Sequence, residues 1–172
     1  MPSIVLVGLM GAGKTTVARL LAERTGTVAL DTDDAIEERT GRAIPELFAT
    51  DGEAVFRRLE ADVVSGLLAD DVERILSLGG GAVTSEPVRA ALDGHHVVWL
   101  RAGPATLIER LGPDEVARRP LLADDAMATL TRLEEEREPY HRRVADLTVD
   151  VDELDPPAVA EAILAALAGG RR

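Results

Sequence analysis

The sequence Gly8-Leu9-Met10-Gly11-Ala12-Gly13-Lys14-Thr15 matches the pattern G-x-x-x-x-G-K-[ST] at every position. A short apolar run rich in β-branched residues, 3–7, precedes it, and residues 16–22 follow with apolar side chains at helical spacing. A strand, a glycine-rich loop and a helix in this order predict a phosphate-binding loop, in which backbone N–H groups and the helix dipole hold a polyphosphate. An ordinary glycine-rich turn is the alternative, and the complete motif with both flanks argues against it.

Two side chains of this loop carry chemistry. Lys14 is a positive charge for the β- and γ-phosphates of a nucleoside triphosphate, and the Thr15 hydroxyl can bind Mg²⁺. The loop therefore predicts nucleoside triphosphate binding, but it does not indicate which reaction follows.

The composition limits the class of protein and its partners. With 172 residues, 46% of them apolar, and no cysteine, the chain is expected to form a single domain, 1–172, without disulfides or thiolate metal sites. Its net charge of −12 argues against a nucleic-acid partner. No apolar run approaches the roughly 20 residues of a membrane span, and no export-type segment begins the chain, so a cytoplasmic location is expected. A monomer is expected because nothing in the composition demands more.

Strand-like and helix-like segments alternate along the chain. Strands are predicted at residues 3–7, 28–30, 74–78, 97–100 and 146–151. Helices are predicted at residues 16–22, 35–40, 44–49, 52–69, 87–92, 104–110 and 156–167. This alternation is typical of an α/β fold with three layers, α/β/α, around a five-stranded parallel sheet. Ligands bind such a sheet beyond the carboxyl ends of its strands, so functional residues are expected directly after strands.

Residues 111–126 show weak periodicity, and a segment of this length without a clear pattern is more often a functional loop than a simple connection. The segment contains Gly112, Pro113, Arg118, Arg119 and Pro120. We interpret it as a mobile lid whose arginines, together with Arg110, close over the phosphates and neutralise their charge. A solvent-exposed basic loop is the alternative.

Acidic residues follow the predicted strand at 28–30. The alternation Asp31-x-Asp33 at a strand end would point both side chains toward the phosphate loop. We expect Asp31 to hold Mg²⁺ through its waters, and Asp33 to contact an acceptor hydroxyl and accept its proton. Capping of the next helix is the alternative, and we retain it for Asp34.

Arg57 and Glu60 lie three positions apart on the predicted helix at 52–69, so their side chains are neighbours. A surface ion pair is the simpler interpretation. The alternative is that Glu60 aims Arg57 at a carboxylate of the acceptor. Arg58 competes for this role, but its spacing from Glu60 is poorer.

Three consecutive glycines, Gly79, Gly80 and Gly81, directly follow the predicted strand at 74–78. Glycines cost backbone entropy, and at a strand end they allow a ligand to approach the main chain closely. We favour ligand contact over a tight turn at positive φ, which one or two glycines would satisfy.

Other residues give weaker signals. Arg137 is expected as a further cation at a helix end. His95, His96 and His141 do not have the spacing of a metal site, and Trp99 is expected in the core. The only metal that the sequence predicts is the Mg²⁺ that accompanies the nucleotide.

Together these motifs resemble the shikimate kinase family, which belongs to the nucleoside monophosphate kinase-like P-loop kinases. The resemblance covers nearly the whole chain, and its motifs are Leu30-Asp31-Thr32-Asp33, Phe56-Arg57-x-x-Glu60, Leu78-Gly79-Gly80-Gly81-Ala82-Val83, Arg119-Pro120-Leu121-Leu122 and Arg137-x-Pro139. The segment from Arg110 to Arg119 is slightly longer than in the family, so Arg118 could share the role of Arg119. Tyr140 stands one position earlier than the family's tyrosine.

The resemblance implies transfer of the ATP γ-phosphoryl group to the 3-hydroxyl of shikimate, in the chorismate pathway to aromatic amino acids. It implies acceptor-binding helices at about 33–60 and an acceptor site made of Asp33, Arg57, Gly79, Gly80, Gly81 and Arg137. Arg57 and Arg137 would hold the carboxylate, and Asp33 would hold the hydroxyls and act as base.

The resemblance also assigns the nucleotide side. The nucleotide would be bound by Gly11, Ala12, Gly13, Lys14, Thr15, Thr16, Arg110, Arg119 and Pro156. Lys14 and Arg119 would stabilise the transferred phosphoryl group, and Thr15 and Asp31 would bind Mg²⁺.

Two other functions remain open from the sequence. One is a kinase of the same fold for another small hydroxy acid, such as gluconate. The other is a regulatory module that binds ATP without an acceptor. The second would explain the phosphate loop but not the acceptor-side residues Asp33, Arg57 and 79–81.

Overall fold

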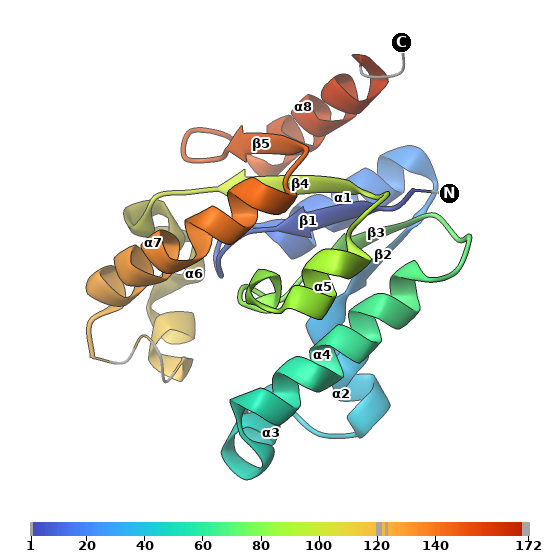
Figure 1. The fold of residues 1–172 in the computed structure, drawn as a ribbon. Coiled ribbons are helices and arrows are strands. Elements are labelled where there is room, and N and C mark those ends of the chain that lie inside the picture. The colour runs from blue at the N-terminus through green and yellow to red at the C-terminus, as the bar shows by residue number, and fades with distance from the viewer. Residues whose placement is uncertain (1, 120–121, 123, 170–172) are drawn as a thin grey trace.

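The structure is a computed structural model that describes residues 2–119, 122 and 124–169. For Arg118 it describes the backbone and not the side chain. Five parallel strands form one sheet in the order β2-β3-β1-β4-β5 (Figure 1). The strands are β1 (Ile4–Val7), β2 (Val28–Asp31), β3 (Arg74–Ser77), β4 (His96–Arg101) and β5 (Leu147–Asp150). The predicted five-stranded parallel sheet is confirmed.

Helices cover both faces of this sheet (Figure 1). They are α1 (Lys14–Thr25), α2 (Thr32–Thr40), α3 (Ile44–Asp51), α4 (Glu53–Leu68), α5 (Glu86–Ala91), α6 (Pro104–Arg118), α7 (Ala126–Val144) and α8 (Pro156–Gly169), with a short 3₁₀ helix, η1, at Ala82–Thr84. None of the helices in the described part of the chain has the length and hydropathy that crossing a lipid bilayer requires.

Alternation along β1 creates the two cores. Ile4 and Leu6 face α1 and α8, whereas Val5 and Val7 face α4 and α5. All four side chains are buried because successive side chains of a strand point to opposite faces and both faces are covered. This arrangement is the predicted three-layer α/β/α architecture.

The predicted α2 needs two corrections. The helix begins at Thr32, not at residue 35, so Asp33 lies in its first helical turn and not on an extended strand end. Its N-cap is Asp31, whose Oδ1 accepts a hydrogen bond from the Asp33 N–H at 3.0 Å, and not Asp34. The predicted stop is confirmed, because Gly41 adopts the left-handed conformation at the C-cap.

The predicted irregular segment at 111–126 is also partly wrong, because α6 continues to Arg118. Gly112 breaks its helical geometry with φ 73° and ψ 164°, and Pro113 begins the second helical part. The glycine and proline that weakened the helical pattern therefore mark a break inside a longer helix. Mobility of this segment stays a prediction.

A long helix, α7, spans Ala126–Val144, where no complete helix or strand was predicted from the sequence. Pro139 lies inside it and argues against a helix in the sequence. Asp125 caps its start by accepting a hydrogen bond from the Ala128 N–H at 2.9 Å. Arg137 therefore lies within a helix, not at a helix end as predicted.

Candidate active site

A cavity of about 760 Å³ lies at the carboxyl ends of the strands, where the topology predicts ligand binding. Predicted site residues that line it are Gly11, Gly13, Lys14, Thr15, Thr16, Asp31, Asp33, Arg57, Gly79, Gly80, Gly81, Arg110, Arg119, Arg137 and Pro156. Of the predicted set only Ala12 is buried behind the cavity wall. Residues that lie far apart in the sequence therefore share one site.

The phosphate loop between β1 and α1 is held by close backbone contacts. Gly8 and Gly11 have positive φ, and a Cβ on Gly11 would lie 2.7 Å from the Leu107 carbonyl oxygen. Only glycine satisfies both the backbone geometry and the space at this position. The loop is thereby fixed against α6, the helix that leads into the predicted lid.

Lys14 is the only lysine in the chain, and it begins α1. Its ammonium donates hydrogen bonds to the carbonyl oxygens of Gly8 at 2.8 Å and Leu9 at 3.0 Å. Burial lowers the pKa of Lys14 to about 8, although the nearby carboxylates of Asp31 and Asp33 oppose this shift. A bound polyphosphate would supply the negative charge that favours the ammonium form.

Thr15, Asp31 and Ser77 bring three oxygen-bearing side chains together. The Thr15 hydroxyl donates to Asp31 Oδ2 at 2.6 Å and lies 3.3 Å from the Ser77 hydroxyl. Ser77 was not among the residues predicted for the site, although its position at the carboxyl end of β3 is a signal for one. Oxygen donors of this kind fit Mg²⁺.

Asp33 is placed for contact with a ligand. Its Oδ1 is buried and has no hydrogen-bond partner among the described residues. Burial, followed by the Asp31 charge, raises the pKa of Asp33, whereas Lys14 and Arg57 oppose the shift. A raised pKa makes the carboxylate a better proton acceptor.

Arg57 and Glu60 form an ion pair at 2.7 Å between Nη1 and Oε2. The Glu60 side chain is 1% exposed and that of Arg57 is 20% exposed, so this is not the surface pair of the simpler interpretation. Glu53 contacts the same guanidinium at 3.5 Å from a much more exposed position. The pair holds the Arg57 guanidinium at the cavity wall.

Two of the three glycines, Gly79 and Gly81, make room for these charged groups, whereas Gly80 lies against the backbone of the phosphate loop. A Cβ on Gly79 would lie 2.9 Å from both Asp33 Oδ1 and Glu60 Oε1, and one on Gly81 would clash with the Arg57 guanidinium. None of the three has positive φ, which excludes the tight-turn explanation. The glycines therefore allow acidic and basic side chains to approach the strand end closely.

Arg137 reaches the same wall from α7. Its Nη1 donates a hydrogen bond to the Gly80 carbonyl oxygen at 2.8 Å. Burial is the main cause that lowers the pKa of Arg137, and the nearby positive charge of Arg57 lowers it further. Two guanidinium groups thus face the cavity near each other, an arrangement suited to a carboxylate.

Arg110 joins the phosphate loop to the start of α8. It donates hydrogen bonds to the carbonyl oxygens of Ala12 at 3.4 Å, Leu154 at 2.9 Å and Val151. Pro156 begins α8 at the same side of the cavity. These groups border the phosphate loop, where the base and ribose of a nucleotide would extend.

Arg119 follows α6 at the edge of the cavity, with Glu115 at 3.7 Å. Its Nε is buried and has no hydrogen-bond partner among the described residues. Pro120 and Leu121, which complete most of the predicted Arg-Pro-Leu-Leu motif, lie outside the described residues, as does the side chain of Arg118.

Apolar side chains that the sequence analysis had not assigned to the site also line the cavity. They are Met10, Ile44, Phe48, Phe56 and Leu78. The rings of Phe48 and Phe56 pack at 4.4 Å between centroids. Phe56 is also a buried residue of the helix core, and a single sequence gives no signal that its edge reaches a ligand cavity.

His141 is buried and stacks on Trp99 with 5.2 Å between ring centroids. Burial is the main cause that lowers the pKa of His141 to about 4, so the ring is neutral. Among the described residues no group of three or more histidine, cysteine or acidic side chains could hold a metal ion. Trp99 lies in the core, as predicted.

A phosphate loop, a parallel sheet with β1 between β3 and β4, and an arginine-rich cavity together define a P-loop kinase fold for a small acceptor. The family model for shikimate kinase matches residues 10–168. A shikimate kinase from Mycobacterium tuberculosis (strain ATCC 25177 / H37Ra) is 53% identical over 96% of this chain and 93% of its own. The chain belongs to the shikimate kinase family, whose members are ATP-dependent kinases.

Solved structures agree with this membership. A shikimate kinase from Acinetobacter baumannii in complex with shikimate superposes with a TM-score of 0.92 at 37% identity, covering 100% of this chain and 96% of that chain. A shikimate kinase from Aquifex aeolicus gives a TM-score of 0.83 at 30% identity, covering 97% and 96%. The predicted fold is confirmed by both.

Proposed function

We propose that the protein transfers the γ-phosphoryl group of ATP to the 3-hydroxyl of shikimate, giving shikimate 3-phosphate and ADP on the route to aromatic amino acids. The observation that carries the proposal is the set of unsatisfied buried polar atoms in one cavity. They are Asp33 Oδ1, Arg57 Nε, Glu60 Oε1 and Arg119 Nε. Buried polar atoms are normally paired, so these atoms indicate a polar ligand.

The acceptor half of the cavity matches a small carboxylated polyol. Arg57 and Arg137 supply two guanidinium groups for the carboxylate, and Asp33 supplies a carboxylate for ring hydroxyls. Phe48 and Phe56 add an apolar wall for the ring carbons. The relative from Acinetobacter baumannii, whose fold this chain shares, was solved with shikimate bound.

In the proposed reaction the acceptor hydroxyl oxygen forms a bond to the γ-phosphorus. The bond between that phosphorus and the β–γ bridging oxygen breaks, and ADP leaves with the electron pair. Asp33 accepts the hydroxyl proton, a role that its raised pKa favours. Lys14 and Arg119 stabilise the charge on the transferred group.

Mg²⁺ would be held by the oxygens of Thr15 and Asp31, with the nucleotide phosphates supplying further ligands. Their hydrogen bond of 2.6 Å places two hard oxygen donors at one point beside the phosphate loop. When bound, the ion neutralises charge on the β- and γ-phosphates. The nucleotide itself would lie along Gly11–Thr16, with Arg110 and Pro156 beside the adenosine.

A coupled assay that measures ADP release tests this function. We expect turnover with shikimate, and neither turnover with gluconate nor ADP release without an acceptor. Equal turnover with gluconate would favour the hydroxy-acid alternative. ATP binding without turnover on any small acid would favour the regulatory module. We also propose that the protein is cytoplasmic and monomeric. Light scattering of the purified protein checks the monomer, and cell fractionation checks the location.

A further inference from the structure

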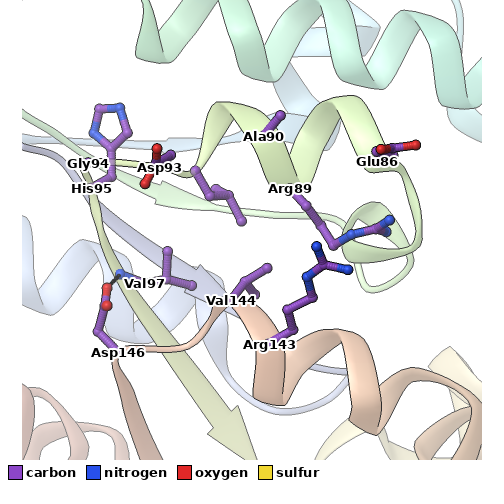
Figure 2. A pocket seen from close by; sticks show the side chains of 11 residues that line it. Glu86, Arg89, Ala90, Asp93, Gly94, His95, Val97, Arg143, Val144 and Asp146 are labelled. Carbon is purple, nitrogen blue, oxygen red and sulfur yellow. Dashed lines mark hydrogen bonds between the residues drawn. The ribbon is translucent and has the colours of Figure 1, made fainter.

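A second cavity of about 510 Å³ lies between α5 and α7, outside the proposed active site (Figure 2). Its lining includes Arg89 of α5, Arg143 of α7 and Val97 of β4. Figure 2 shows the guanidinium groups of Arg89 and Arg143 pointing toward one another from the two helices. Two like charges that face each other across a cavity repel unless an anion lies between them.

Arg89 is already held in place. Its Nη1 donates a hydrogen bond to the Val83 carbonyl oxygen at 2.7 Å, and its guanidinium lies 4.8 Å from the centre of the Tyr140 ring. Arg143 is three positions after Tyr140 on α7, so it lies on the same side of that helix. Arg89 is therefore preorganised, which reduces the entropy that binding would cost on its side of the cavity.

The described carboxylates of this cavity form no ion pair with the two arginines, although Glu86 lies three positions before Arg89 on α5. Among the described residues, no ion pair joins Arg89 or Arg143 to Glu86, Asp93 or Asp146. Asp146 instead accepts a hydrogen bond from the Val97 N–H at 2.8 Å. In Figure 2, Asp93 and Asp146 lie at the end of the cavity away from the arginines.

The geometry points to an anion site in which Arg89 and Arg143 together bind a small oxyanion, the phosphate or carboxylate group of a small molecule. Planar guanidinium groups bind both kinds of oxyanion in a bidentate manner. Because the arginines are partly exposed to water, we expect a dissociation constant of about 1 mM.

Two contacts connect the elements of this anion site to those of the acceptor pocket. Arg89 binds the carbonyl of Val83 in η1, which directly follows the three glycines, and Arg143 shares α7 with Arg137, which binds the Gly80 carbonyl. An oxyanion bridging the arginines would fix α5 and α7 against each other. We therefore expect it to tighten acceptor binding, an effect that rests on the proposed function.

Thermal melting tests the site, with saturating MgADP present to occupy the phosphate loop. Sodium phosphate at about 20 mM, compared with chloride of equal ionic strength, should raise the Tm of the wild type by roughly 5 °C. Arg143→Gln should lose this shift. Arg142→Gln is the matched control and should keep it, because the neighbouring Arg142 pairs with Glu138 at 2.6 Å. Citrate in place of phosphate distinguishes a carboxylate preference.

An equal phosphate shift in Arg143→Gln, or no shift in the wild type with either anion, would overturn the site. For the coupling, calorimetry should show that the oxyanion lowers the shikimate Kd about two- to fivefold in the wild type but not in Arg143→Gln. An unchanged Kd would overturn the coupling. Absence of shikimate binding would instead refute the proposed function, while the Tm shift would still report on the anion site.

Discussion

The Glu60 carboxylate lies 2.7 Å from the Arg57 guanidinium and is itself 1% exposed. Its second oxygen, Oε1, is buried without a hydrogen-bond partner among the described residues. Burial is the main cause that raises the pKa of Glu60, and Arg57 opposes the shift. A buried carboxylate with one oxygen committed to an arginine is a positioning group: it orients Arg57 toward the cavity.

Replacement of Glu60 tests this relationship. Glu60→Gln should raise KM for shikimate about 10- to 100-fold, because a charged hydrogen bond to Arg57 is lost, and should leave KM for ATP nearly unchanged. Glu53→Gln removes the exposed partner at 3.5 Å and should change neither constant by more than about twofold. A rise confined to KM for ATP would contradict the role of Arg57 in acceptor binding.

A methyl group on Gly79 should disturb the acceptor pocket without unfolding the protein. The Cβ of Gly79→Ala would lie 2.9 Å from Asp33 Oδ1 and Glu60 Oε1, so both carboxylates must move. We expect kcat/KM for shikimate to fall about 100-fold. Gly66→Ala, at a helical position with open space, should retain full activity and gain about 0.5–1 kcal/mol of stability.

Removal of the proposed base should separate activity from stability. Asp33→Asn should lower kcat about 10²- to 10⁴-fold, the usual contribution of general-base catalysis. Its Tm should equal or exceed that of the wild type, because the variant removes a charge that burial and Asp31 disfavour. Glu38→Gln, at an exposed position of the same helix that does not line the cavity, is the control. A similar loss of kcat in both variants would argue against a specific base.

The single lysine predicts a pH dependence of ATP use. The pKa of Lys14 in the free protein is about 8, so the ammonium loses its proton as the pH rises through that value. We expect kcat/KM for ATP to decline above about pH 8, whereas kcat persists to higher pH because bound phosphates favour the charged form. Pre-steady-state binding of ATP across this range would show whether affinity follows the same profile.

The lowered pKa of Lys14 also predicts how the stability of the fold depends on pH, and this dependence is opposite to that of ATP use. Between about pH 8 and the ordinary lysine value of 10.5, the unfolded chain holds a proton on Lys14 that the folded protein has released. The Lys14 contribution to the free energy of unfolding therefore increases with pH in this window. Denaturant titrations of wild type and Lys14→Met should differ in their pH slopes there; parallel slopes would refute the shifted pKa.

Arg110 should affect the nucleotide side alone. Arg110→Ala removes the contacts to the phosphate loop and to the start of α8, so KM for ATP should rise about tenfold with little change for shikimate. Arg101→Ala breaks an exposed ion pair with Asp150 at 2.7 Å and serves as the control. An equal rise in both Michaelis constants would indicate a general loss of structure.

The order of strands and helices could be predicted because the spacing of apolar residues, and the glycines that end helices, are local properties of the chain. Apolar β-branched runs mark the strands, and Gly41 and Gly26 end helices in the left-handed conformation that glycine favours. The errors also have local causes. Glycine and proline usually interrupt helices. Pro139 therefore argued against a helix where α7 lies, and Gly112 with Pro113 argued against the second part of α6.

The phosphate loop and its nucleotide could be inferred from sequence alone, because the geometry of this loop depends on glycine spacing within eight consecutive residues. The family could be inferred because five further short motifs follow the loop in order along the chain. Only the tertiary structure could show that Glu60 is buried, that Ser77 joins Thr15 and Asp31, and that the glycines leave room for charged side chains. Burial and proximity between distant segments depend on how the sheet and helices pack, and no local pattern encodes them.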